Sequence, residues 1–226
     1  MSRSELVQIA ERIVACRACE RLVVYREEVA RVKRRAYRDE EYWGKPVPGF
    51  GDPNARLLIV GLAPGAHGAN RTGRVFTGDR SGDFLFEAMY ETGFASQPHG
   101  RHRDDGLRLI DAFLAGAGRC APPGNKPLPQ ELGNCRHFLI EEIAALKNIK
   151  VVLCLGRIAL DAYLKARDLG PARAFPFAHG AVLEAATPIV CSYHPSQQNT
   201  QTGRLTQAML QSAFVTAREC FEAQPR

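Results

Sequence analysis

Gly61-Leu62-Ala63-Pro64-Gly65-Ala66-His67-Gly68-Ala69-Asn70-Arg71-Thr72-Gly73-Arg74-Val75-Phe76-Thr77-Gly78-Asp79-Arg80-Ser81-Gly82 follows the apolar run Leu57-Leu58-Ile59-Val60. An apolar run that opens into a glycine-rich segment predicts a buried strand followed by a loop. Glycine lets the backbone approach a ligand closely because it has no β-carbon. In an open parallel sheet, ligands bind at loops that follow the carboxyl ends of strands, so this loop is the first candidate binding site.

The side chains of this loop suit a flat heterocycle. Phe76 offers a stacking surface, and His67, Asn70 and Asp79 offer polar groups. The loop matches neither the dinucleotide fingerprint nor the phosphate-binding loop that ends in Gly-Lys-Ser/Thr. An ordinary surface connection is the alternative interpretation, although structureless loops of this length in compact domains are usually functional or disordered.

The bulk composition indicates a globular protein with a polyanionic partner. The chain has 226 residues, 45% of them hydrophobic, and we expect one domain over residues 1–226. It shows neither an apolar run of about 20 residues nor a secretory signal, so we expect a soluble cytoplasmic protein with no membrane partner. The net charge of +6 favours nucleic acid. The arginines and lysine that suggest phosphate contacts are Arg31, Lys33, Arg34, Arg35, Arg38, Arg71, Arg74 and Arg80.

Strand and helix patterns alternate along the chain, which predicts an α/β fold with a parallel sheet flanked by helices. The expected strands are 56–60, 107–115, 150–156 and 188–193. The expected helices are 4–15, 21–38, 82–91 with Ser81 as its cap, 129–146, 157–167 and 203–221. Loops that begin at Gly61, Cys120 and His194 follow strands expected to be parallel, so they should converge on one edge of the sheet.

Four of the seven cysteines are spaced as metal ligands. They occur as Cys16-x2-Cys19 and Cys120-x14-Cys135, near loops and helix ends, whereas Cys154, Cys191 and Cys220 lie within expected strands or the last helix. Four thiolates can bind zinc or an iron–sulfur cluster, and spacing alone does not decide between them. Four unrelated buried thiols are the alternative. Either metal would tie the N-terminal helices to the second strand-end loop.

The motifs together resemble the uracil-DNA glycosylase superfamily. The resemblance is carried by Gly61-Leu62-Ala63-Pro64-Gly65, Phe76-Thr77-Gly78-Asp79, Cys120-Ala121-Pro122-Pro123 with Asn125, and His194-Pro195-Ser196. The cysteine spacing and the Gly-Ala-Asn-Arg-Thr-Gly-Arg continuation are similar to family 5, the type B enzymes. This resemblance implies an α/β/α sandwich with a central four-stranded parallel sheet, and a [4Fe-4S] cluster bound partly by an N-terminal helical segment of about residues 1–50.

The resemblance also implies roles for individual residues. His194 would donate a hydrogen bond to the departing pyrimidine anion, and Asp79 would stabilise the cationic sugar and orient water. Phe76 would stack on the flipped base and Asn125 would read its Watson–Crick edge. The residues expected to contact the base or the DNA are Gly61, Ala63, Pro64, Gly65, His67, Asn70, Phe76, Asn125, Ser196, Gln197 and Asn199.

Two departures from the superfamily pattern bear on these roles. Other branches place an acidic or amide residue early in the first loop, where this chain has Ala63, Gly65 and Ala66, so Asp79 is the nearest carboxylate. The loop after His194 carries Gln197 and Gln198, where apolar wedges are the usual intercalators. We therefore expect a polar plug in the vacated duplex space.

The expected activity is that of a monomeric, monofunctional glycosylase. It would remove uracil, and also hypoxanthine and xanthine, from double-stranded DNA, because small first-loop residues leave room for purines. Three other functions remain open on sequence grounds. They are a non-catalytic iron–sulfur protein that binds DNA, a nucleotide- or phosphate-binding enzyme, and a related protein that captures abasic DNA covalently.

Overall fold

The core of the fold is a six-stranded sheet with the strand order β1-β3-β2-β4-β6-β5. A computed structural model describes residues 2–223; Met1 and residues 224–226 of the expected domain lie outside the described residues. The strands are β1 (Phe50–Gly51), β2 (Leu57–Gly61), β3 (Ala112–Gly116), β4 (Val151–Leu155), β5 (Val182–Leu183) and β6 (Ile189–Ser192). The four central strands are mutually parallel. The predicted central four-stranded parallel sheet is therefore confirmed.

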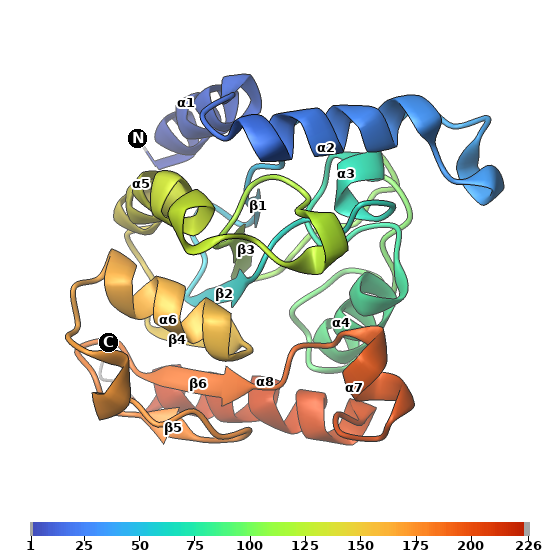
Figure 1. Ribbon diagram of the computed structural model, residues 1–226. Coiled ribbons are helices and arrows are strands. Elements are labelled where there is room, and N and C mark those ends of the chain that lie inside the picture. Colours follow the sequence, from blue (N-terminus) through green and yellow to red (C-terminus); the bar gives the residue numbers. More distant parts are fainter. Residues whose placement is uncertain (1, 224–226) are drawn as a thin grey trace.

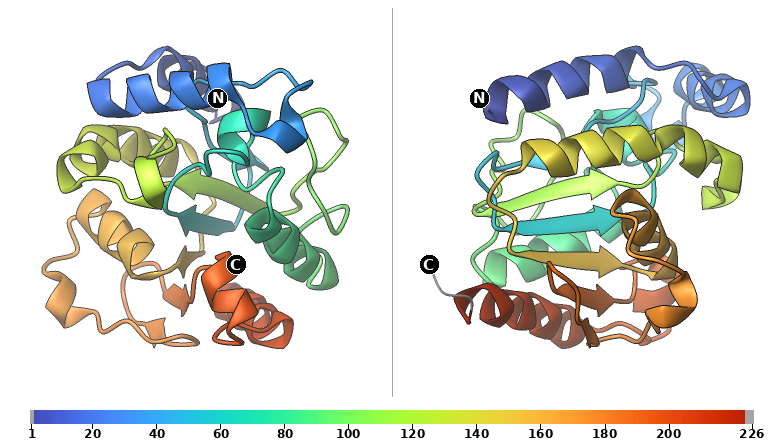
Figure 2. Two further views of the ribbon diagram at one scale, coloured as in Figure 1. Left: turned by 45° about the vertical axis from the view of Figure 1, so that its right-hand side comes forward. Right: turned by 90° about the vertical axis from the view of Figure 1, so that its left-hand side faces the viewer.

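Helices cover both faces of the sheet, giving three layers (Figure 1). The helices are α1 (Ser2–Ala15), α2 (Glu20–Val32), α3 (Ala69–Thr72), α4 (Arg80–Glu91), α5 (Pro129–Ala145), α6 (Arg157–Ala166), α7 (Gln197–Gln201) and α8 (Gln207–Glu222). Short 3-10 turns occur at η1 (Arg35–Tyr37), η2 (Pro123–Asn125) and η3 (Ala172–Ala174). Helices α4 and α8 pack together on one face, α5 and α6 pack on the other, and α1 lies outside against α5 (Figure 2).

Alternating residues of the central strands build two separate cores. In β2, Leu57 and Ile59 face the core shared with α4 and α8, while Leu58 and Val60 face the core shared with α5 and α6. Successive strand side chains point to opposite faces, so a strand covered on both sides must be apolar throughout. This requirement explains the uninterrupted apolar run in the sequence, and all four residues are 0% exposed.

The sheet differs from the expected one at its edges. Two-residue strands β1 and β5 pair antiparallel with β3 and β6, which the sequence analysis did not predict. The expected strand 107–115 begins only at Ala112, because Asp111 adopts a positive φ of 55° and turns the chain. Its carboxylate receives hydrogen bonds from the Arg56 backbone N–H at 2.8 Å and the Arg56 side chain at 2.7 Å.

Three expected helices have different ends. Helix α2 ends at Val32 rather than Arg38, since Lys33 adopts a φ of 58° and the chain then forms η1. The expected helix 203–221 begins later, at Gln207, and is preceded by α7. Helix α4 is capped by Asp79, whose carboxylate accepts the Gly82 N–H, so the predicted Ser81 cap is wrong. Among residues 2–223, no helix combines the length and apolar character that crossing a bilayer requires.

A buried ion pair joins the loop after β3 to helix α5. The Arg119 guanidinium donates to Glu142 at 3.1 and 2.5 Å, and the two side chains are 2% and 3% exposed. Glu142 also accepts the Gly49 N–H at 3.0 Å, so three chain segments meet at one carboxylate.

We expect Glu142→Ala to lower the free energy of unfolding by about 3–5 kcal/mol, because it leaves a buried guanidinium without its partner. The matched control is Glu141→Ala, at the preceding residue of α5, whose ion pair with Arg12 is exposed. That change is expected to cost no more than about 1 kcal/mol. Denaturant titration of both variants measures the difference, and equal destabilisation would contradict the assignment.

Candidate active site

Two strand-end loops meet above β2 and β6. The rings of Phe76, from the first loop, and His194, which follows β6, have centroids 5.7 Å apart and planes inclined by 30°. A β-carbon at Gly61 would lie 2.6 Å from the Phe76 ring, so this position has no room for a side chain. The convergence of the loops at Gly61 and His194 is therefore confirmed.

The third loop touches the first near its start. The Gly118 N–H donates to the Leu62 carbonyl at 2.8 Å, and a β-carbon at Gly118 would lie 3.5 Å from that of Ala63. Asn125 lies further along, in η2, with a positive φ of 57° and an exposed side chain. No contact joins Asn125 to Phe76 or His194 in the described structure, so its predicted reading of a base edge stays a prediction.

Asp79 sits at the amino end of α4, against the glycines of the first loop. Its Oδ1 accepts the Gly82 N–H at 3.0 Å, and its Oδ2 lies 2.9 Å from where a β-carbon of Gly65 would stand. A β-carbon on Gly68 would overlap the same oxygen. Burial raises the pKa of the Asp79 carboxyl, while the Gly82 and Ser81 backbone N–H groups oppose the shift.

The Asp79 carboxylate projects into space that two glycines of the first loop leave open. Asp79 brings its Oδ2 into the space that a side chain at position 65 would occupy, and glycines at positions 65 and 68 leave that space open. A carboxylate from the end of the loop thus lies beside the beginning of the same loop. Gly68 carried no signal in the sequence beyond being one glycine among several.

His194 is held in the neutral form. Burial lowers its pKa to about 4, so the imidazole is uncharged at pH 7 and has one N–H to donate. Its backbone is fixed by Asn199, whose side-chain amide donates to the His194 carbonyl at 2.8 Å. Ser196 caps α7 by accepting the Asn199 N–H, and Gln197 is exposed. In this structure Ser196 and Asn199 order the His194 loop, and Gln197 is free to reach a partner.

Two polar residues of the first loop, Asn70 and His67, make contacts within the protein. Asn70 is 0% exposed, and its amide donates to the Arg26 carbonyl of α2 at 3.2 Å. The expectation that Asn70 contacts a base or DNA is therefore wrong, because helix α3 turns its side chain inward. His67 is half-buried, with its Nδ1 3.0 Å from the Tyr42 hydroxyl. Burial, Arg34 and Arg71 lower the pKa of His67.

The arginines of the first loop are likewise internal. Arg71 is 8% exposed, is paired with Glu40, and donates to the Gly78 carbonyl at 2.7 Å. Arg74 is 4% exposed and makes two 2.8 Å hydrogen bonds to Asp105. Their expected phosphate contacts are wrong, since both guanidinium groups already hold the loop in shape. Arg34, Arg35 and Arg38 remain exposed around η1.

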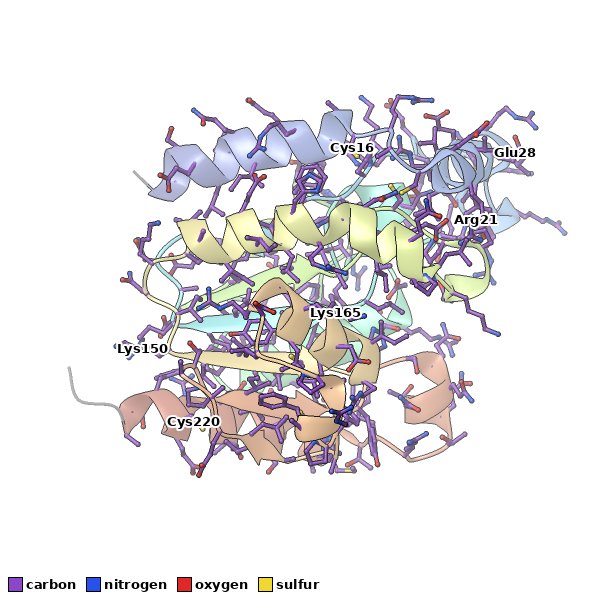
Figure 3. All side chains as sticks on the ribbon, turned by 60° about the vertical axis from the view of Figure 1, so that its left-hand side comes forward. Cys16, Arg21, Glu28, Lys150, Lys165 and Cys220 are labelled. Carbon is purple, nitrogen blue, oxygen red and sulfur yellow. The ribbon has the colours of Figure 1, made fainter. Side chains whose placement is uncertain are left out.

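The four spaced cysteines converge. Cys16, Cys19, Cys120 and Cys135 line one small cavity between the N-terminal helices and α5. Cys220 lies in α8 at the opposite side of the molecule from Cys16 (Figure 3). The four cysteines are therefore neighbours in space, and a group bound by them stays a prediction. Within residues 2–223, no three histidine, cysteine, aspartate or glutamate side chains are arranged to hold a single metal ion.

The cavity provides the donors that a thiolate-bound group needs. The Arg26 guanidinium, 2% exposed, donates to Cys120 Sγ at 2.9 Å, and the Asn134 amide donates to Cys19 Sγ at 3.3 Å. The nearest carboxylate to Arg26 is that of Glu27, at 3.8 Å and largely committed to Arg17. A buried cation requires an anion nearby, and thiolates would supply that charge. Burial raises the pKa of the Cys120 thiol to about 11, so a bound metal would have to displace its proton.

Comparison with known proteins identifies the family of this chain. The uracil DNA glycosylase superfamily model matches residues 48–218. The chain is 50% identical over 220 residues to a type-5 uracil-DNA glycosylase of Thermus thermophilus, covering 96% of this chain and 98% of that protein. It is 46% identical over 196 residues to a type-5 enzyme of Pyrobaculum aerophilum, covering 86% and 84%. It is 30% identical over 170 residues to a type-4 enzyme of Thermotoga maritima, covering 74% and 71%. This chain therefore belongs to the uracil-DNA glycosylase superfamily, in its type-5 branch.

Proposed function

We propose that this protein removes uracil from double-stranded DNA by hydrolysing the bond between the base and the deoxyribose, leaving an abasic site. The observation that carries the proposal is the juxtaposition of a neutral, partly buried His194 and Phe76 at the strand ends, with the Asp79 carboxylate cradled by glycines in the loop of Phe76. Type-5 and type-4 relatives are named uracil-DNA glycosylases. We propose that the chain works as one domain and as a monomer in the cytoplasm.

The proposed reaction starts with extrusion of the nucleotide, because the target bond is inaccessible inside the stacked duplex. The Phe76 ring, packed on Gly61, would form one wall for the flipped base. The backbone of Ala63, Pro64 and Gly65 would line the entrance, and the exposed Asn125 amide would read the Watson–Crick edge. Ser196, Gln197 and Asn199 belong to the loop that would face the vacated duplex space.

Bond cleavage creates a cationic sugar and an anionic base, and each needs a preorganised partner. The neutral His194 imidazole would donate its N–H to a carbonyl oxygen of the departing uracil anion. The ionised Asp79 carboxylate would stabilise the sugar cation and orient the water that adds to its anomeric carbon. The water loses a proton as the new C–O bond forms and the released uracil anion takes up a proton, so the products are neutral uracil and an abasic site with an unbroken strand.

We propose that Cys16, Cys19, Cys120 and Cys135 hold a [4Fe-4S] cluster. Four thiols around one cavity, with N–H donors from Arg26 and Asn134, suit such a group. The cluster, when bound, would act as a structural crosslink and not as a redox reagent. Its four ligands would tie the segment between α1 and α2 to the β3 loop and α5.

The proposed substrate range includes hypoxanthine and xanthine. The early first-loop positions are Ala63, Gly65 and Ala66, and no bulky side chain there excludes a purine. A strict preference for uracil over hypoxanthine in matched duplexes would contradict this part of the proposal.

The test is incubation of the purified protein with labelled duplexes that carry one uracil or one hypoxanthine, followed by alkali to break abasic sites. The visible absorption spectrum is recorded on the same sample. Cleavage that depends on alkali supports a monofunctional glycosylase, and a broad brown absorbance supports the cluster. Cleavage without alkali would indicate strand incision, and no cleavage despite cluster absorbance would leave a DNA-binding iron–sulfur protein.

The pH profile tests the assigned protonation states. Burial raises the pKa of Asp79 above the ordinary aspartate value of about 3.9, and the ionised form is the active one. The excision rate is therefore expected to fall as pH drops through that raised pKa. The pKa of His194 is about 4, so its imidazole is neutral between pH 6 and 9. Titration of His194 therefore adds no change in the excision rate between pH 6 and 9. Single-turnover rates across pH measure the profile, and an unchanged acid transition in Asp79→Asn would contradict the assignment.

A further inference from the structure

Asn70 connects helix α2 to the first loop through its side chain. Its side-chain amide donates to the Arg26 carbonyl of α2 at 3.2 Å and to the Ala66 carbonyl of the first loop at 3.4 Å. Its backbone N–H donates to the Gly65 carbonyl at 3.0 Å. One fully buried residue thus holds both the first loop and the helix beside the cysteine cavity.

The loop end of this connection reaches Asp79. Gly65 and Gly68 form the surface against which the Asp79 Oδ2 is packed. The Gly68 N–H also donates to the Gly65 carbonyl, at 3.2 Å, so Asn70 and Gly68 converge on the same acceptor. A shift of the Gly65–Ala66 backbone would therefore move the cradle of the carboxylate.

The other end of the connection reaches the cysteines. The guanidinium of the same Arg26 donates to Cys120 Sγ at 2.9 Å and to the Cys16 carbonyl at 3.4 Å. Arg26 therefore holds two of the four cysteine positions with its side chain and Asn70 with its backbone. In Figure 1, α2 runs directly above α3, and these helices are in contact.

The arrangement leaves polar groups unsatisfied. Arg26 Nε and Asn70 Oδ1 are both buried and find no hydrogen-bond partner among the described residues. An unsatisfied buried polar atom costs free energy, so apolar residues of similar size would pack here at lower cost. Both side chains therefore stand here for the hydrogen bonds that they do make, from Arg26 to Cys120 and from Asn70 to the Arg26 carbonyl.

We propose that Arg26 and Asn70 form a fixed link through which the four-cysteine centre positions the first loop and the Asp79 cradle. Asn70 is in this view a positioning residue, because it touches neither base nor sugar. The inference rests on the proposed function, since it assigns the link a purpose only if Asp79 acts in base excision.

The first test compares Asn70→Ala and the isosteric Asn70→Asp with Asn148→Ala. Asn148 also donates its amide to a distant backbone carbonyl, at 3.4 Å, but lies on the exposed surface away from the site. Both Asn70 variants are expected to lower kcat for uracil excision roughly 10- to 100-fold with little change in KM, because a small displacement of a catalytic group is enough. Their visible absorbance per protein should equal that of the parent.

The second test measures the amide hydrogen-exchange rate of residues 62–72, because a general loss of stability would raise exchange in the sheet as well as in this loop. Asn70→Ala is expected to raise exchange there without raising it in the sheet. Arg26→Met should raise the exchange rate of residues 62–72 when it is introduced into the parent protein. Added to Asn70→Ala, it should raise that rate little further, since the two residues form one path. Additive effects, or exchange that changes while kcat does not, would overturn the link. Failure of the parent protein to excise uracil would instead defeat the proposed function.

Discussion

Replacement of Asp79 by asparagine is expected to lower the single-turnover rate of uracil excision by roughly 100- to 10,000-fold, the range for loss of a positioned acid or base group. Asparagine keeps an oxygen that can accept the Gly82 N–H, which Asp79 Oδ1 accepts at 3.0 Å, so the cap of α4 is retained. What is lost is the negative charge that would orient water and stabilise the sugar cation. Excess enzyme over a uracil duplex, quenched with alkali, measures the rate.

The matched control is Asp83→Asn, which removes the same charge from an exposed position in the first turn of the same helix. We expect its rate to stay within about threefold of the parent, because screening weakens exposed charges. DNA affinity is measured for both variants by titration of an abasic duplex. Equal loss in the two variants would show a general charge effect and contradict the assigned role of Asp79.

Replacement of His194 by alanine is expected to lower excision by roughly 100- to 1,000-fold, as for removal of one donor from an anion-stabilising site. The imidazole is neutral at pH 7 because burial lowers its pKa to about 4. The lost hydrogen bond would act on the leaving base, so uracil should be more affected than substrates with a better leaving group. Single-turnover excision of uracil and 5-fluorouracil from matched duplexes checks this dependence.

Two further variants test whether the loss of activity in His194→Ala comes from a disturbed structure. His137→Ala changes an exposed histidine on α5 and should leave the rate unchanged. His194→Gln keeps an amide donor and fills part of the space beside Phe76, so it should recover part of the activity. A His194→Ala protein with parent-like excision, or one whose loss is explained entirely by weaker DNA binding, would refute the proposed role.

The sequence predicted the central strands well because their signal is local. A strand buried on both faces must be apolar at every position, and Leu57–Val60 shows this without reference to any other part of the chain. The two-residue strands β1 and β5 carry no comparable pattern, and they form only because β3 and β6 offer free edges. The cap of α4 was misassigned to Ser81 for a similar reason, since Asp79 and Ser81 both suit a cap and the path of the loop decides.

The candidate site was predictable in its residue types but not in the direction of its side chains. Asp79, His194 and the four cysteines were identified from motif and spacing, and the structure brings His194 to Phe76 and the cysteines to one cavity. Asn70, Arg71 and Arg74 have the same chemistry as ligand-binding residues, yet they point inward to Arg26, Glu40 and Asp105. A loop without a regular period gives no indication of which side chains face the solvent.

The sequence alone thus determined the parallel α/β core, the four-cysteine set and the strand-end loops, because strand burial and ligand spacing are read from neighbouring residues. Only the tertiary structure decided how the Asp79 carboxylate lies against the beginning of the loop. Asp79 reaches the Gly65–Gly68 cradle because the intervening loop is folded back by Arg71 and Arg74. The link from Cys120 through Arg26 to Asn70 likewise depends on the tertiary structure. Arg26 is 94 positions from Cys120 and 44 positions from Asn70, and helix packing brings these residues into contact.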